Sequence, residues 1–526
     1  MRLVYLQEGQ GYGVEKLRSL CFGEEPPDFA KGPDFFERLA DAMNRGQKIV
    51  RKSGNVYSFE FVGLFDFTDK ETHENLTFFF WPKFVSDSTL DRFKDDGRAL
   101  RDESRNAILL AIDRCHKEMR LPEVADERPE MERESLLELA VRVLRDYLEN
   151  DIYTVRPTEL EHNGQGEIDW NETIDRYQPV FLKGESGKPR PCYMDTAMEI
   201  SLPDENHYLT RLHRCLVTTW GRKLEELGLS TVLRVNVPLL SEDDLSYFGD
   251  AEQQIARIDQ ELGVQFVTKS RTTLKLMKEL IGRASDSETD LREQLSFGMN
   301  KAEHLWEAAC AKVLGSELDE PISKYGLEWK SDKPDESFRG YMPKPIWCKI
   351  DGENTPREDS EAYSEKSGWR LDFIRTWRPT KDDPVEKLVI LDAKYYDVSW
   401  NEKGTVISDQ PGIGDIAKQV FYQMAFEDLI SFKRIGKEIG FVNAFLLPED
   451  DNSPFLHKDT NGKPTSTAYE RVHLGWGGKR ALAFGGVNLF TIRLPGIELL
   501  RRYATGAPGE DWFTEIVSST PKEPTP

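Results

Sequence analysis

The stretch that most constrains this chain runs from Gly368 to Asp397 and has the sequence GWRLDFIRTWRPTKDDPVEKLVILDAKYYD. Its first part, Trp369 to Trp377, is rich in aromatic and β-branched residues, and its last part, Lys387 to Tyr395, contains an unbroken apolar run. The segment between them carries a proline near each end, which is a turn signal. The stretch therefore predicts two strands joined by a turn, with the second strand buried.

Charged residues occur in both predicted strands. Asp372 lies between Leu371 and Phe373, while Asp392 and Lys394 come at the end of the second strand. Because side chains alternate along a strand, Asp392 and Lys394 should share one face. Two carboxylates on adjacent strands can hold a hard cation such as Mg²⁺, and a lysine beside them can orient the attacking water and stabilise charge on a phosphate. The pattern indicates a metal-dependent phosphodiesterase core.

A simpler interpretation of the D-x-K tripeptide is a solvated strand end. Such tripeptides are common, and an aspartate and a lysine are expected where a strand meets water. Asp372 favours the functional interpretation, because a carboxylate among the apolar residues of a strand must be paired, bound to metal or placed at the end of the ladder.

The residues after this tripeptide predict a helix and another strand. Residues 415–430 begin with an aspartate and place Gln419 and Gln423 one turn apart on a single helix face. Residues 439–447, IGFVNAFLL, predict a buried strand. The apolar set expected on the helix is Ile416, Val420, Met424 and Leu429.

This order of elements resembles the PD-(D/E)XK nuclease core, and within that superfamily the chain is most similar to the McrC and LlaJI type of restriction subunit. The resemblance covers most of the chain. Its supporting stretches are LTFFFWPKF (Leu76 to Phe84), GEIDWNETI (Gly166 to Ile174) and FGMNKAEHLWEAACAKVLG (Phe297 to Gly315). It implies an α/β fold with the nuclease core at the C-terminus and β-rich and helical domains before it.

The resemblance also implies a metal site for Mg²⁺ (or Mn²⁺). Asp372, Asp392 and the carbonyl of Ala393 would be the ligands, and Lys394 would position the nucleophilic water. Many relatives carry glutamate where this chain has Asp392, so the reach to the metal is shorter here while the charge is kept.

Two further residues would complete the catalytic pocket by resemblance. Gln423 belongs to the helix after the D-x-K strand, and Glu307 belongs to a helix predicted over residues 299–314. Glu303 lies one turn before Glu307, so which of the two is the helix acid stays open, and both could be surface residues.

The charge balance favours a protein that works with a partner. Seventy lysines and arginines against 93 aspartates and glutamates give a net charge of −23. An acidic chain gains little from neutralising phosphates, so tight autonomous DNA binding is not expected. By resemblance the chain is the DNA-cutting subunit of a McrBC/LlaJI-type restriction system, and a separate McrB-like AAA+ GTPase translocates the DNA. A nuclease-fold adaptor of such a motor, or a nuclease acting on RNA or single strands, remains open.

The sequence excludes or disfavours other classes. It contains no P-loop motif, so the chain hydrolyses no nucleotide by that route. No apolar run is long enough to span a membrane and no signal segment begins the chain, which predicts a cytoplasmic protein.

The expected domain organisation has four parts. Residues 1–85 form a β-rich domain, 86–295 a mainly helical region for partner or DNA contact, 296–510 the nuclease domain and 511–526 a disordered tail. A basic segment from Lys269 to Arg283 faces DNA or is a solvated helix face. The aromatics of residues 78–81 favour a core role over base stacking. Glu167 and Asp169 are expected on an exposed strand edge.

Overall fold

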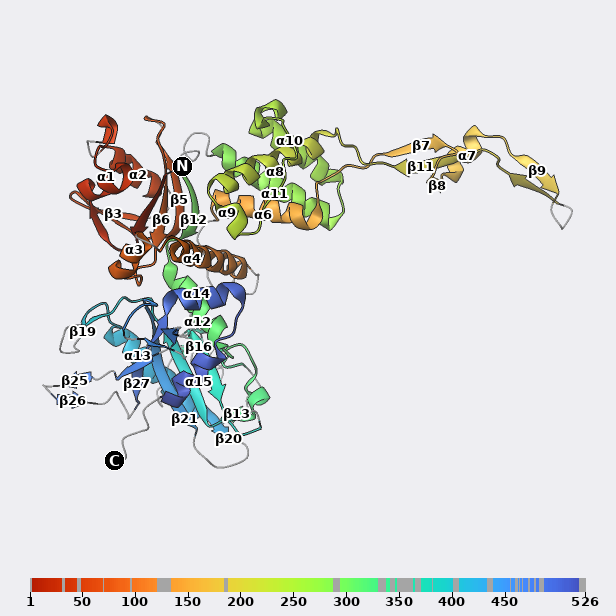
Figure 1. Ribbon diagram of the computed structural model, residues 1–526. Helices are drawn as coiled ribbons and strands as arrows, with labels where there is room; N and C mark the ends of the chain where they lie inside the picture. The colour runs from red at the N-terminus through yellow and green to blue at the C-terminus, as the bar shows by residue number, and fades with distance from the viewer. Residues whose placement is uncertain are drawn as a thin grey trace. The chain divides into compact units, whose positions relative to one another are not determined.

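The structure is a computed structural model (Figure 1). It describes the chain except residues 1, 31–33, 45–48, 70, 95–96, 121–133, 184–187, 287–293, 330–336, 341–345, 348–362, 365–369, 381, 401–405, 433–438, 455, 459–461, 463, 466, 472–473, 477–478, 482–486 and 520–526.

The chain packs into two compact units. Unit 1 comprises Met1–Arg2, Phe65–Thr77 and Glu132–Phe297, and unit 2 comprises Leu3–Leu64, Phe78–Met131 and Gly298–Pro526. The domain boundaries expected from the sequence, at residues 85 and 295, do not coincide with the limits of these two units. The expected domains remain a prediction. In the structure, most of the first 131 residues belong to the same unit as the C-terminal residues.

Unit 2 contains a mixed five-stranded sheet with the order β16-β17-β21-β27-β24. The antiparallel pair β16 and β17 confirms the predicted hairpin, and β17, β21 and β27 run parallel to one another. Parallel neighbours need a crossover, which helix α13 provides between β17 and β21. The bounds are β16 Phe373–Trp377, β17 Lys387–Ala393, α13 Ile413–Leu429, β21 Gly440–Glu449, β24 Thr467–Arg471 and β27 Leu489–Pro495.

Helices cover both faces of this sheet. Ile374 packs in one apolar cluster with Tyr422 and Phe426 of α13. The neighbouring Phe373 contacts Phe513 of α15 (Glu510–Ser519), with ring centroids 6.3 Å apart. Because neighbouring residues of a strand point to opposite faces, the two contacts lie on opposite sides of the sheet. This double cover explains the continuous apolar run of residues 388–391 in β17.

Helix α12 (Ala302–Leu314) contacts β17 and confirms the predicted helix near residues 299–314. Its predicted apolar side is buried, with Leu305, Trp306, Ala309 and Val313 each less than 5% exposed.

The predicted apolar face of α13 needs one correction. Ile416 and Val420 are buried as expected, but Met424 is 43% exposed. The amides Gln419 and Gln423 are buried in its place. They occupy the i+3 and i+7 positions from Ile416, so the helical repeat directs them inward although they are polar. The side chain of Leu429 lies outside the described residues.

The N-terminal part of the chain is mixed. A four-stranded sheet has the order β1-β6-β5-β12, and a three-stranded sheet has the order β2-β4-β3. Residues 78–81 on β6 are at most 1% exposed, which confirms their predicted core role. The bounds are β1 Arg2–Gln7, β2 Gly11–Gly13, α1 Val14–Phe22, α2 Asp34–Asn44, β3 Val50–Ser53, β4 Val56–Phe59, β5 Val62–Thr68, β6 Asn75–Trp81, α3 Asp87–Lys94, α4 Arg98–Met119 and β12 Gln294–Met299.

Unit 1 is mainly helical, with α6 (Leu136–Asn150), α8 (Tyr208–Glu226), α10 (Ala251–Val264) and α11 (Thr268–Asp286) in contact. The basic segment lies on α11. Lys278 pairs with Asp259 at 2.6 Å, and the Arg271 guanidinium donates to two backbone carbonyls. Arg283 pairs with Glu279 on its own helix. Three cations of the basic segment therefore contact other groups of the protein.

A narrow ribbon of small sheets interrupts the helices of unit 1 (Figure 1). Glu167 lies on the short exposed strand β8, as predicted. Asp169 does not continue that strand, because its carboxylate accepts hydrogen bonds from the amides of Asn171 and Glu172 and so caps α7. The bounds are β7 Thr158–His162, β8 Glu167–Ile168, α7 Trp170–Arg176, β9 Val180–Lys183, β10 Pro189–Cys192 and β11 Ala197–Ser201.

The described residues of the expected tail, 511–519, lie in a helix. Helix α15 spans Glu510–Ser519, and four of its apolar residues are buried: Trp512, Phe513, Ile516 and Val517. Their spacing gives the helix one apolar face that packs on unit 2, so these residues are ordered. Within the described ranges, no helix is both long and apolar enough to cross a membrane.

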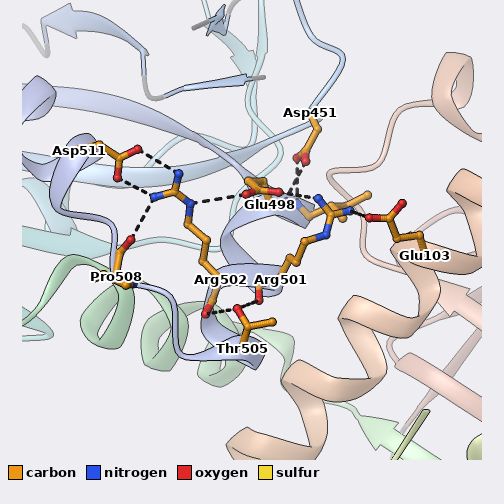
Figure 2. A network of polar contacts seen from close by, with 9 residues as sticks. Glu103, Asp451, Glu498, Arg501, Arg502, Thr505, Pro508 and Asp511 are labelled. Atoms are coloured by element: carbon orange, nitrogen blue, oxygen red, sulfur yellow. Dashed lines mark hydrogen bonds and ion pairs between the residues drawn. The ribbon is translucent and has the colours of Figure 1, made fainter. Parts of the chain in front are cut away.

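A half-buried acid, Asp451, caps helix α14 (Gly496–Thr505) from outside the helix (Figure 2). The Asp451 carboxylate accepts hydrogen bonds from the amides of Ile497 and Glu498, each at 2.9 Å. On the same helix, Arg501 pairs with Glu103 of α4, and Arg502 pairs with Asp511 at the start of α15. These contacts fix α14 between its neighbours.

The Asp451 cap predicts a specific pH dependence of stability. Burial raises the pKa of Asp451 to about 7, although the two amide donors act against this. The protonated carboxyl stabilises the fold fully below the unfolded pKa, and this stabilisation is lost as pH rises through the folded pKa. We therefore expect wild type to lose stability relative to Asp451→Asn between about pH 4 and about pH 8, measured by denaturant unfolding.

Asp511→Asn is the matched control. Burial opposes ionisation of Asp511, but the hydrogen bond from Arg502 outweighs it and lowers the pKa. This variant should therefore change the pH profile only in the acid range. If the stability of Asp451→Asn fell with rising pH as steeply as that of wild type, this result would contradict the account of the cap.

Candidate functional site

The two predicted acids meet where β16 and β17 pair. Asp372 immediately precedes β16, and Asp392 is the penultimate residue of β17. The register pairs Phe373 with Leu391, which brings the residues beside them together. The backbone amide of Ala393 donates to Oδ2 of Asp372 at 3.2 Å. The hairpin thus brings together two carboxylates that are 20 positions apart in sequence.

Lys394 follows β17 directly and contacts two acids. Its Nζ lies 2.9 Å from Oδ2 of Asp392, so the two side chains share a side of the chain as predicted. It also lies 3.3 Å from Oδ1 of Asp415, in the first turn of α13. Burial acts to lower the pKa of Lys394, but the charges of Asp392 and Asp415 outweigh it and the pKa is raised. The side chain is therefore a cation at neutral pH.

The carboxyl of Asp372 lies where a negative charge is unfavourable. Burial raises the pKa of its carboxyl well above the usual range, and the charges of Asp392 and Glu307 raise it further. Lys394 acts in the opposite direction without cancelling these effects. Two acids crowded in a poorly solvated place repel one another, so this cluster favours a bound cation or proton.

Backbone contacts hold the end of β17 in place. The amide of Lys394 donates to the carbonyl of Leu446 on the parallel strand β21 at 2.9 Å. The same carbonyl accepts a hydrogen bond from the indole of Trp306 on α12 at 3.2 Å. Lys394 is thereby tied to both the sheet and the helix that carries Glu307.

The two candidate helix acids point to different neighbours. Glu307 is half-buried and its charge acts on Asp372 and on the Cys310 thiol. Glu303 is exposed, and its charge acts on Glu8 instead. The structure therefore brings Glu307 into the electrostatic neighbourhood of Asp372. A catalytic role for Glu307 stays a prediction.

Gln423 belongs to a buried amide group beneath the site. Its Nε2 donates to Glu427 at 2.6 Å, and its Oε1 accepts a hydrogen bond from Asn443 of β21 at 3.2 Å. Gln419, one turn before it, is fully buried and neither of its amide atoms has a hydrogen-bond partner. These unpaired groups in the core are costly and are the kind found at functional sites.

The sequence pattern does not identify Asp415 as a site residue. The pattern identified it only as the start of a helix. Its contact with Lys394 depends on where the β17–α13 connection places that helix start, which no local pattern encodes. The sequence therefore shows the acid at the helix start but gives no indication that it pairs with Lys394.

The donor set is compatible with a hard cation. Asp372, Asp392 and the predicted carbonyl of Ala393 offer only oxygen, which suits Mg²⁺ or Mn²⁺. Among the residues that the structure describes, no three His, Cys, Asp or Glu side chains form a group that could hold a metal. The predicted set has only two such side chains, so it differs in kind from a three-side-chain site.

Comparison with known proteins places the chain in a family. The model of the LlaJI restriction endonuclease family matches residues 72–460. The type II restriction enzyme BsuMI component YdjA of Bacillus subtilis (strain 168) is 27% identical over 302 residues, covering 57% of this chain and 55% of that protein. The match thus spans about half the length of this curated relative.

Two solved assemblies from Thermococcus gammatolerans also align. In the half-complex of McrB AAA+ hexamers with bound McrC, one chain gives a TM-score of 0.37 at 11% identity, with 96% of this chain and 99% of that chain covered. In the McrBC complex, the TM-score is 0.22 at 11% identity, with 53% and 79% covered. Scores this low establish no shared fold. The family match, by contrast, covers most of the sequence and confirms the predicted LlaJI-type resemblance: the chain belongs to the LlaJI restriction endonuclease family.

Proposed function

We propose that the chain is the Mg²⁺-dependent (or Mn²⁺-dependent) DNA endonuclease subunit of a restriction system and cuts DNA together with a separate McrB-like AAA+ GTPase. The observation that carries this proposal is the meeting of Asp372, Asp392 and Lys394 at one end of a buried hairpin. Membership of a restriction endonuclease family supports the same reaction, the hydrolysis of a phosphodiester bond.

Asp372 and Asp392 would hold the metal together with the Ala393 carbonyl. Their mutual repulsion disfavours two negative charges without a cation, which supports a binding role over a purely structural one. When bound, the ion would supply Lewis acidity toward the phosphate and lower the pKa of a water molecule.

Lys394 would act as a fixed positive charge. Because its pKa is raised, it is a poor proton acceptor at neutral pH and a good hydrogen-bond donor. It would orient the attacking water and stabilise negative charge that develops on the phosphate. Asp392 and Asp415 limit the positions that its Nζ can take.

Glu307 and Gln423 would complete the pocket from the two helices on either side of the hairpin. Glu307 adds negative charge beside Asp372, which would strengthen attraction for a cation. Gln423 would keep the end of α13 in register with β21 through Asn443.

The net charge of −23 supports a division of labour with a motor. Phosphate neutralisation supplies most non-specific DNA affinity, and the basic segment on α11 has three cations engaged internally. The Thermococcus gammatolerans assemblies named above pair McrC with McrB AAA+ hexamers. A partner of this kind would bind the DNA tightly and translocate it.

The alternative is a nuclease-fold adaptor that regulates the motor without cutting. The close ion pair between Lys394 and Asp392 is the observation that favours it, because an aspartate satisfied by lysine has less need of a metal. Metal-dependent nicking of supercoiled plasmid separates the two functions, since an adaptor nicks no DNA with or without its partner.

The first test of the nuclease function replaces Asp372. Asp372→Asn should abolish nicking while leaving cooperative thermal unfolding at or above the wild-type temperature, because it removes a charge that burial and its neighbours disfavour. Calorimetric unfolding and plasmid nicking with Mg²⁺ measure both effects. Loss of cooperative unfolding together with activity would instead identify Asp372 as a structural residue.

The second test replaces Lys394 and uses Lys117 as a matched control. Lys117 pairs with Asp113 at 3.1 Å on α4, away from the hairpin. Lys394→Ala should lower the nicking rate by on the order of a hundredfold or more, the cost of removing a donor that stabilises developing charge. The Lys117→Ala variant should nick plasmid DNA at the wild-type rate. Full activity in Lys394→Ala would remove this lysine from the mechanism.

A third test measures DNA binding by the isolated chain. We expect only weak binding to duplex DNA at physiological salt, in the range of about 10⁻⁴ to 10⁻⁶ M typical of non-specific contacts. Fluorescence anisotropy across a salt series provides the measurement. Nanomolar, sequence-specific binding without a partner would show that the recognition function lies in this chain.

A further inference from the structure

The N-terminal part of unit 2 touches the residue that follows Lys394. The Tyr395 hydroxyl donates a hydrogen bond to Oε2 of Glu8 at 2.5 Å, across 387 positions of sequence. The same carboxylate oxygen accepts a hydrogen bond from the backbone amide of Lys83 at 3.2 Å. Glu8 is partly buried, and this burial raises its pKa to about 7.

A short segment after β6 encloses the Tyr395 ring. The ammonium of Lys83 lies 4.9 Å from the ring centroid, and the ring of Phe84 meets it edge-on at 6.2 Å. Phe84 also contacts Trp306 of α12, with centroids 6.3 Å apart. Gln7 fixes this segment, because its side-chain amide donates to the carbonyls of Lys83 and Val85.

These contacts bear on the position of Lys394. Its backbone is held on one side by the Leu446 carbonyl, which Trp306 also contacts. The next residue, Tyr395, is held on the other side by the hydrogen bond from its hydroxyl to Glu8 and by the contact of its ring with Phe84. Residues 394–398 belong to no strand, so the direction of the lysine side chain depends also on such side-chain anchors.

We propose that Glu8 and Tyr395 are a pair of positioning residues that set the catalytic geometry of Lys394, so that the N-terminal residues are part of the active site's construction. The proposal rests on the proposed nuclease function and adds residues that neither the D-x-K pattern nor the helix after it contains. It assigns no chemical step to either residue.

The Tyr395→Phe variant tests the pair most directly. It removes one hydroxyl and keeps the ring that Lys83 and Phe84 contact. We expect kcat for plasmid nicking by the full chain with Mg²⁺ to fall roughly ten- to a hundredfold, the cost of a small misplacement of a catalytic group, with KM for DNA unchanged. Glu8→Ala should give the same kcat, and the double variant should be no slower than either, because the two act as one unit.

The conservative variant Glu8→Gln should restore most of the rate. Both hydrogen bonds end on the same oxygen of Glu8, so a single amide carbonyl can accept them.

Tyr503 provides a matched control. Its hydroxyl donates to the Glu118 carboxylate at 2.6 Å in the same unit, and neither residue contacts the hairpin acids in the described structure. Tyr503→Phe removes a hydrogen bond of the same type and should lower stability about as much as Tyr395→Phe while leaving kcat unchanged. Equal loss of kcat in both variants would assign the effect to general stability and overturn the proposal.

Hydrogen exchange gives a readout that does not depend on activity. The amide of Lys394 is bonded to Leu446, and Tyr395→Phe should speed its exchange by on the order of tenfold, while Tyr503→Phe should not. Absence of nicking by the wild-type chain, both alone and with its AAA+ partner, would overturn the proposed function, and the exchange comparison would then decide the positioning role alone. Wild-type exchange at Lys394 in Tyr395→Phe would overturn the positioning role.

Discussion

The repulsion between Asp372 and Asp392 is the constraint on which the site depends. The hairpin of β16 and β17 brings their carboxylates together in a poorly solvated place, where two bare negative charges are unfavourable. The arrangement persists because Lys394 and the Ala393 amide offset part of the charge. A cluster that is incomplete without further positive charge is better suited to binding a cation than to holding a sheet together.

The rest of unit 2 makes this cluster possible by restricting where its members can go. β17 is buried on both faces between helices, and α13 returns the chain to β21 in parallel. That crossover brings the start of α13, with Asp415, to the lysine. The first residues of the chain add a second restraint through Glu8, which belongs to the same compact unit as the C-terminal sheet.

The sequence predicted the hairpin, the helices α12 and α13 and the grouping of Asp372, Asp392 and Lys394, because strand alternation and apolar patterning are local properties. It predicted the face of α13 less well, since Gln419 and Gln423 take core positions that polarity argues against. It also missed α15, whose apolar spacing is short and lies beside a polar terminus. The partners of Lys394 and Tyr395 could not be predicted, because Asp415 and Glu8 reach them through tertiary packing. Roles for Glu307 and Gln423 remain predictions.

The central claim is that Asp372 and Asp392 bind a divalent cation, and anomalous diffraction from a crystal grown with Mn²⁺ tests it most directly. The account predicts a manganese peak in contact with both carboxylates, with Lys394 moved from its close pairing with Asp392 toward the space where a phosphate would lie. A crystal of the same protein that shows no manganese at these two aspartates, with the ion pair to Lys394 intact, would contradict it.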